Sequence, residues 1–117
     1  MSDENTPPQP PRTRRTAADR LRAALSDLHQ HRGQVLTHTE KAWASITFAG
    51  TRHTLRMVFD TPEAVEGGEA LIAALPDHEF ALPGRLVADA TVSAVDHAAG
   101  PPPRMVVTCE LLLLEDG

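Results

Sequence analysis

Apolar and polar residues alternate through residues 42–59, which is typical of a β-hairpin with one buried face. Within this segment, Gly50-Thr51 is a Gly-X pair that suits a two-residue type II′ loop. That loop predicts an apolar face on which the pairs are Phe48 and His53, Ile46 and Leu55, Ala44 and Met57, and Ala42 and Phe59. Since a slip of one residue would exchange the two faces, the pattern predicts the register as well as the strands.

A second, longer hairpin is predicted from residues 86–95 and 105–114. Residues 96–104 contain Gly100 followed by three prolines, which cannot donate hydrogen bonds to a ladder, so this segment is expected to be a loop. The predicted buried face comprises Leu86, Ala88, Ala90, Val92 and Ala94 on the first strand, and Met105, Val107, Cys109, Leu111 and Leu113 on the second.

A first helix is predicted to begin after Thr16, which is a good N-cap residue, with Asp19 placed to complete a capping box. Helical spacing then relates Leu21, Ala24, Leu25 and Leu28. Gly33 is expected to be the C′ residue that ends this helix. The apolar stripe is narrow, so we expect the helix at the edge of the domain or against a partner.

A second helix is predicted to begin at Thr61, where a threonine N-cap precedes Pro62, and to end at Pro76. Val65, Leu71, Ile72 and Leu75 are expected to face inward. Gly67-Gly68 in the middle of this segment lowers the stability of the helix by roughly 1 kcal/mol per residue relative to alanine. The pair therefore favours close packing of the helix backbone on the sheet, with the approach of a ligand or partner as the alternative.

A short strand at residues 35–39, broken by a bulge or turn at Glu40-Lys41, is predicted before the first hairpin. The order of elements predicts an α+β two-layer sandwich, in which one antiparallel sheet of four to five strands (two hairpins) carries two helices on one side. Residues 1–15 are rich in proline and arginine and hold no large apolar residue except Met1. We therefore expect a disordered arm there, followed by a single domain at 16–117.

The charge distribution is uneven, with six arginines against four acids in residues 1–33 but five basic residues against twelve acids in residues 34–117. Such an acidic body argues against binding to nucleic acid. No apolar run approaches the roughly twenty residues that span a membrane, and the N-terminus lacks the apolar region of a signal peptide. The single Cys109 lies in an apolar run, so a buried, unreactive thiol and a cytoplasmic location are expected.

Ionisable residues on the polar sheet face form a candidate site for a ligand or for catalysis. One register of the second hairpin pairs Asp89 with Glu110, where two carboxylates would repel and one could hold a proton. The next allowed register pairs Thr91 with Glu110 instead, and the sequence leaves both open. Arg56 would neutralise either arrangement if the hairpins adjoin, and Trp43 would form a wall. The simpler interpretation is a solvated sheet face with an ordinary salt bridge.

Six histidines, His29, His31, His38, His53, His78 and His97, raise the question of metal binding. The chain has no His-Glu-x-x-His run and no second cysteine, so no metal site is predicted. His53, placed opposite Phe48 near the predicted turn, is expected to be half-buried at the edge of the core. Phosphate-binding and nucleophile motifs are absent from the sequence, and no cofactor is predicted.

The predicted outer sheet face keeps several apolar residues, namely Trp43, Val58, Val87, Leu112 and Leu114. A small monomer rarely leaves such a patch open. The sequence therefore predicts a non-enzymatic protein-interaction module that self-associates as a homodimer through this face or through the first helix, or that binds another protein. The alternative is a small-molecule or enzymatic site around Arg56, Asp89 and Glu110.

Overall fold

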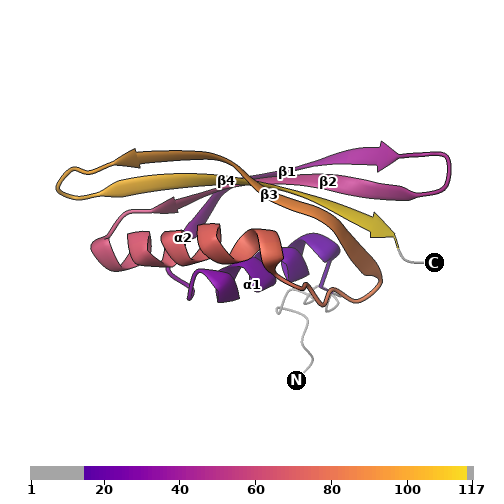
Figure 1. Ribbon diagram of the computed structural model, residues 1–117, viewed down its shortest axis with the longest axis horizontal. Coiled ribbons are helices and arrows are strands. Elements are labelled where there is room, and N and C mark those ends of the chain that lie inside the picture. The colour runs from indigo at the N-terminus through magenta and orange to yellow at the C-terminus, as the bar shows by residue number, and fades with distance from the viewer. Residues whose placement is uncertain (1–14, 116–117) are drawn as a thin grey trace, which may run out of the picture.

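The computed structural model describes residues 15–115, so the predicted arm lies, except for Arg15, outside the described residues. The elements are α1 (Ala17–Leu28), β1 (Gln34–Ala44), β2 (Ala49–Phe59), α2 (Pro62–Ala74), the short 3-10 helix η1 (Leu75–Asp77), β3 (Arg85–Ala98) and β4 (Arg104–Glu115). The strands form one antiparallel four-stranded sheet in the order β1-β2-β4-β3. Both helices lie on the same side of this sheet (Figure 1). The predicted α+β fold with two hairpins is confirmed.

Helix α1 begins as its sequence predicts. The Thr16 hydroxyl accepts a hydrogen bond from the Asp19 N–H at 3.1 Å, and the Asp19 carboxylate accepts one from the Thr16 N–H at 3.1 Å. These bonds to Thr16 lower the pKa of the Asp19 carboxyl. The helix packs Ala18, Leu21 and Leu25 into the core.

The end of α1 differs from the prediction, because the helix stops at Leu28 and Gly33 is not its C′ residue. Two residues with left-handed backbone, Gln30 (φ 61°) and His31 (φ 58°), complete the turn instead. Gly33 has a different role, since the ring of Phe59 occupies the space that a side chain at this position would need.

Helix α2 begins at Pro62, and the Thr61 hydroxyl accepts a hydrogen bond from the Ala64 N–H at 3.0 Å. Its two glycines pack closely, as predicted. A Cβ at Gly67 would lie 2.5 Å from the carbonyl oxygen of His29, and one at Gly68 would collide with Met105 and with the Phe59 ring. The glycine pair therefore lets α2 lie against both the sheet and the end of α1.

The β1–β2 hairpin turns at residues 45–48, so the turn predicted at Gly50-Thr51 and its register are wrong. Ala44 pairs with Ala49. The Ser45 N–H donates a hydrogen bond to the Phe48 carbonyl at 2.7 Å, and the Phe48 N–H donates one to the Ser45 hydroxyl at 3.1 Å. A serine that bonds across four residues closes the loop without a glycine in the turn.

Strand β1 also runs straight through Glu40-Lys41, where a break was predicted, and its bulge lies earlier, between Val35 and Thr37. Gly50 lies within β2, where the backbone of β4 at Leu113 passes too close for a side chain. The inner face of β2 is nevertheless the predicted one, with His53, Leu55, Met57 and Phe59 all buried. The observed and predicted registers differ by an even number of residues, which preserves the faces.

Two β-bulges interrupt β3, one between Val87 and Asp89 and one between Val92 and Ala94. The prediction of one continuous apolar face on this strand is therefore wrong. Leu86 and Ala94 lie on the outer face, where they pair with Leu114 and Thr108. Val87, predicted on the outer face, instead packs against the core. Each bulge inserts one residue and so exchanges the two faces.

The core lies between the helices and the inner sheet face. It includes Leu21 and Leu25 of α1, Leu71 of α2, Leu55, Met57 and Phe59 of β2, and Met105, Val107, Cys109, Leu111 and Leu113 of β4. The two hairpins extend past the helices at opposite ends of the molecule, with the β1–β2 loop on the right and the β3–β4 loop on the left of Figure 1. Residues at the hairpin ends therefore lie beyond the cover of α1 and α2.

Candidate functional site

The four residues predicted to form a ligand site lie on the outer face of the sheet, one on each strand: Trp43 on β1, Arg56 on β2, Glu110 on β4 and Asp89 on β3. Thr91 pairs with Glu110, and Asp89 pairs with Leu112. Of the two registers that the sequence left open, the structure has the one in which Asp89 and Glu110 do not face each other.

Glu110 lies near two of the other three residues, but Arg56 and Asp89 do not come near each other, because β4 separates their strands and their partners on β4, Thr108 and Leu112, are four residues apart. Glu110 pairs with Thr54, two residues from Arg56, and so lies diagonal to Arg56, at the roughly 7–8 Å typical of such positions. Asp89 is diagonal to Glu110 on the other side. Trp43 pairs with Gly50, about 20 Å along β2 from Arg56 at the usual rise of a strand. Binding of a small molecule by Arg56, Asp89 and Glu110 stays a prediction.

The apolar patch expected on the outer face is smaller than predicted. Val58, Leu112 and Leu114 are buried, because they lie on the two central strands between the side chains of their neighbours. Trp43 is half-buried, and Leu86, which the bulge moves to this face, is 59% exposed. The accessible apolar surface there is therefore concentrated at one end of the sheet.

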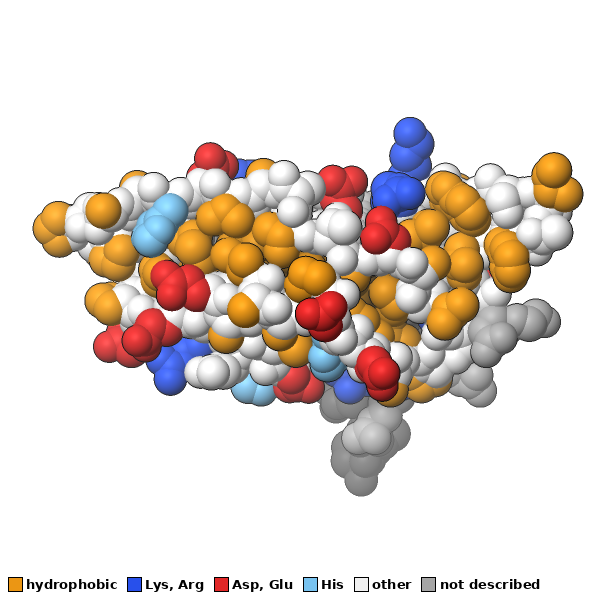
Figure 2. All heavy atoms as spheres, viewed as in Figure 1, with side chains coloured by type: hydrophobic (Ala, Val, Ile, Leu, Met, Phe, Trp, Pro, Cys, Tyr) orange, Lys and Arg blue, Asp and Glu red, His pale blue; other side chains and the backbone are white. Residues whose placement is uncertain are grey.

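Ile46, the most exposed large apolar side chain among the described residues, lies with Phe48 in the β1–β2 loop, which we call the apolar tip (residues 45–48). Ile46 is 103% exposed and Phe48 is 54% exposed. Figure 2 shows hydrophobic side chains at the right-hand end of the molecule, where Figure 1 places the β1–β2 loop. The hydrogen bonds between Ser45 and Phe48 hold the loop in one shape. The tip is thus a fixed, uncharged projection with two apolar side chains.

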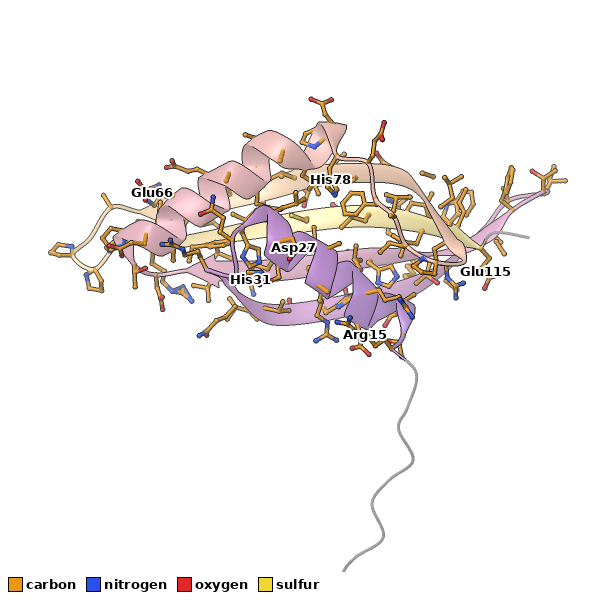
Figure 3. The ribbon with its side chains drawn as sticks, turned by 90° about the horizontal axis from the view of Figure 1, so that it is seen from below. Arg15, Asp27, His31, Glu66, His78 and Glu115 are labelled. Atoms are coloured by element: carbon orange, nitrogen blue, oxygen red, sulfur yellow. The ribbon has the colours of Figure 1, made fainter. Side chains whose placement is uncertain are left out.

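A groove of about 420 Å³, which we call the α1 groove, opens between α1 and the first two strands. Its apolar lining includes Leu25, Val35, Leu55 and Met57. Charged residues also line it: the basic Arg22 and the acidic Asp19 of α1, and the basic Arg15 just before the helix. Figure 3 shows Arg15 at the start of α1, with Asp27 and His31 at its far end. The groove joins an apolar floor to a charged border.

A cluster of three side chains, which we call the histidine cluster, lies on the inner face where β1 meets β2. It comprises His38, Glu40 and His53, whose potential ligand atoms all lie within 4.8 Å of one another. His38 Nε2 is 2.8 Å from His53 Nδ1, and the two rings share one hydrogen bond. His53 is 1% exposed, so the prediction that it is half-buried is wrong.

The charges around the histidine cluster are mixed. Burial lowers the pKa of both imidazoles, and the neighbouring His53 and Arg22 lower that of His38 further. Glu40 acts in the opposite direction on both rings. Both histidines are therefore neutral near pH 7, and each offers a lone pair.

The predicted turn concealed this cluster, because it paired His53 with Phe48. In the structure Glu40 pairs with His53, and His38 lies two residues from Glu40 on the same side of β1. The His-x-Glu spacing of His38 and Glu40 was visible in the sequence, but the incorrectly predicted turn did not place these residues beside His53.

Cys109 is fully buried, as predicted, and burial raises the pKa of its thiol to about 12. Within residues 15–115, no helix combines the length and the apolar character needed to cross a membrane.

No protein-family model matches the chain, and no curated protein sequence matches it. Among solved structures, the fold is similar to that of a chain in the virion of a native gene transfer agent (GTA) particle. The TM-score is 0.54 at 14% sequence identity, and the match covers 86% of this chain and 92% of that chain. At this identity the likeness shows a shared fold.

Proposed function

We propose that this protein is a non-enzymatic interaction module that self-associates, with the apolar tip of one copy bound in the α1 groove of the next. The observation that carries the proposal is the apolar tip itself, on which Ile46 is wholly exposed and Phe48 is more than half exposed. Exposed apolar surface of this kind marks interaction sites on soluble proteins.

The tip suits a protein contact because it is pre-shaped and uncharged. The bonds between Ser45 and Phe48 fix the loop before binding, which reduces the entropy that association must offset. None of the residues 45–48 is ionisable, so no charge has to leave water when the tip is covered.

The α1 groove is a fitting receptor for this tip. Its volume of about 420 Å³ lies in the range of sites that enclose small organic groups, and its floor is apolar. A chain cannot fill its own groove, because β1 runs straight from Val35 in the groove to Ala44 at the turn, about 30 Å away. The contact therefore has to join two copies.

Tip and groove are different surfaces, so their contact is heterologous. Such contacts build rings when the rotation between copies closes, and filaments when it does not. The fold likeness to a virion chain supports an assembly role of this kind. A homodimer through the outer sheet face, where Leu86 is exposed, is the competing arrangement and is distinguished by the experiment below.

The strength of the contact follows from its size. Full burial of the Ile46 and Phe48 side chains stabilises association by about 1.5–3 kcal/mol each, while lost translational and rotational freedom costs about 4–15 kcal/mol. The tip alone does not hold the assembly, so the outer edge of β1, which pairs with no strand among residues 15–115, has to contribute hydrogen bonds or packing. We expect a dissociation constant for the contact of about tens of micromolar.

Sedimentation velocity across a concentration series tests this function. The wild-type chain is expected to form oligomers at tens of micromolar, and an Ile46→Ser/Phe48→Ser variant is expected to remain monomeric. Leu86→Ser is the control, because it removes from the outer face an apolar side chain about as exposed as Phe48. A monomeric wild type contradicts the proposal, and a monomeric Leu86→Ser variant assigns the contact to the outer face instead.

A further inference from the structure

We propose that His38, Glu40 and His53 bind a divalent transition-metal ion of the zinc type. The site is independent of the proposed self-association. It rests on the register of β1 and β2 and on the close approach of the three side chains.

Strand geometry brings the three side chains together. His38 and Glu40 are two residues apart on β1 and so point to the same face, and Glu40 pairs directly with His53 on β2. Their ligand atoms lie within 4.8 Å of one another. Two strands of a regular ladder hold the site, so it does not depend on a loop.

Distances in the cluster suit a metal after a small adjustment. His38 Nε2 and His53 Nδ1 lie 2.8 Å apart. Two imidazole nitrogens bound to a tetrahedral ion at about 2.0–2.1 Å are separated by about 3.3 Å. The rings would have to separate by about half an ångström. The Glu40 side chain is exposed and free to adjust.

One atom of the cluster has no partner within the described chain. Nδ1 of His38 is buried and makes no hydrogen bond among the residues that the structure describes. Nearly all buried polar atoms in native proteins are paired. With the ion on Nε2, Nδ1 of His38 would carry the ring proton and would not be a ligand, so the register and the distances between the side chains are what support the ion.

The donor set selects the type of ion. Two imidazole nitrogens and one carboxylate oxygen are ligands that zinc prefers, whereas calcium and magnesium prefer sites made wholly of oxygen. Three protein ligands leave a further position for water or another ligand. Because His38 and Glu40 lie on β1 and His53 lies on β2, a bound ion would join the two strands of the projecting hairpin.

Calorimetric titration of the untagged full-length protein with Zn²⁺ tests the site. We expect one equivalent to bind, and a His38→Ala/Glu40→Ala variant to bind at least about tenfold more weakly, since even partners outside the ligand shell change metal affinity by 10–100-fold. His78→Ala/Glu79→Ala is the matched control, because it removes an exposed His-Glu pair near the end of α2, where Figure 3 places His78. This control is expected to bind as tightly as the wild type.

Nuclear magnetic resonance of the histidine rings provides a second readout on the unaltered protein. Zn²⁺ is expected to shift the ring signals of His38 and His53 and to leave those of His78 and His97 unchanged. The absence of saturable binding would overturn the proposal. Equal binding by the His38→Ala/Glu40→Ala variant, or shifts confined to other histidines, would also overturn it.

Discussion

Replacement of Gly67 by alanine isolates the close packing of α2 on the end of α1. In an exposed helix the change from glycine to alanine raises the free energy of unfolding by about 1 kcal/mol. Here the added Cβ would lie 2.5 Å from the carbonyl oxygen of His29 and 2.9 Å from Cβ of Arg32. Ordinary contacts begin at 3.4 Å, so the backbones of the two elements would have to separate by about 0.9 Å.

The size of the expected loss of stability depends on which atoms have to move to make room for the added Cβ at Gly67. Overpacking costs typically about 1–3 kcal/mol, and the upper part of that range applies where the clash is with backbone. His29 is held firmly, because it is 3% exposed and its Nδ1 accepts hydrogen bonds from the N–H groups of Arg32 and Gly33 at 3.2 Å each. After the helix-propensity gain, Gly67→Ala should lower the free energy of unfolding by about 1–2 kcal/mol.

Urea unfolding followed by circular dichroism measures this change. Each kcal/mol corresponds to a fall in Tm of roughly 4–8 °C for a domain of about this size. Glu69→Gly is the control, since it lies on the exposed side of the same helix and should lose about 1 kcal/mol through propensity alone. If Gly67→Ala instead stabilised the protein by about the amount that Glu69→Gly loses, the close packing of α1 on α2 would be refuted.

Three further predictions follow from burial and from the sequence. Burial lowers the pKa of His29, so the unfolded chain binds a proton at this residue more readily than the folded one, and the stability due to His29 is present above about pH 6.5 and is lost as the pH falls below it. In urea unfolding, a His29→Asn variant should therefore lose less stability than the wild type between pH 7 and pH 5. An equal loss would contradict the role of His29. Cys109, whose pKa is raised to about 12 by burial, should react with a thiol reagent only at the rate of unfolding, and rapid reaction of the native protein would contradict its burial. Deletion of residues 1–15 should leave Tm within a few degrees, and a truncated chain that fails to fold would contradict the prediction of a dispensable arm.

The sequence predicted both helix starts because their signals are local. Thr16 with Asp19 and Thr61 with Pro62 each place a complete cap within four residues, and no distant contact is needed to read it. Burial of Cys109 was likewise readable from the alternating pattern of its own strand.

The turn of the first hairpin was not readable in the same way. Gly50-Thr51 fits a tight turn, and Ser45 also closes a turn, through its bonds to Phe48. Both registers bury the same face of β2, so the hydrophobic pattern does not separate them. The decisive contact is the close approach of β4 to Gly50, which is distant in sequence.

The incorrectly predicted turn also concealed two candidate sites, the histidine cluster and the apolar tip. Pairing His53 with Phe48 hid the histidine cluster, and it placed Ile46 and Phe48 on a buried face instead of at the exposed tip. On β3, the bulges decide which residues lie on the outer face with Asp89, and nothing in the local pattern marks their positions.

The most direct test of self-association through tip and groove is a mixing experiment. Ile46→Ser/Phe48→Ser keeps the groove and lacks the tip, while Ala23→Arg keeps the tip and fills the groove that Ala23 lines. Each variant alone should sediment as a monomer, and an equimolar mixture should form a dimer and nothing larger, since one intact contact remains. A mixture that stays monomeric, or an Ala23→Arg variant that assembles like the wild type, would contradict the head-to-tail contact.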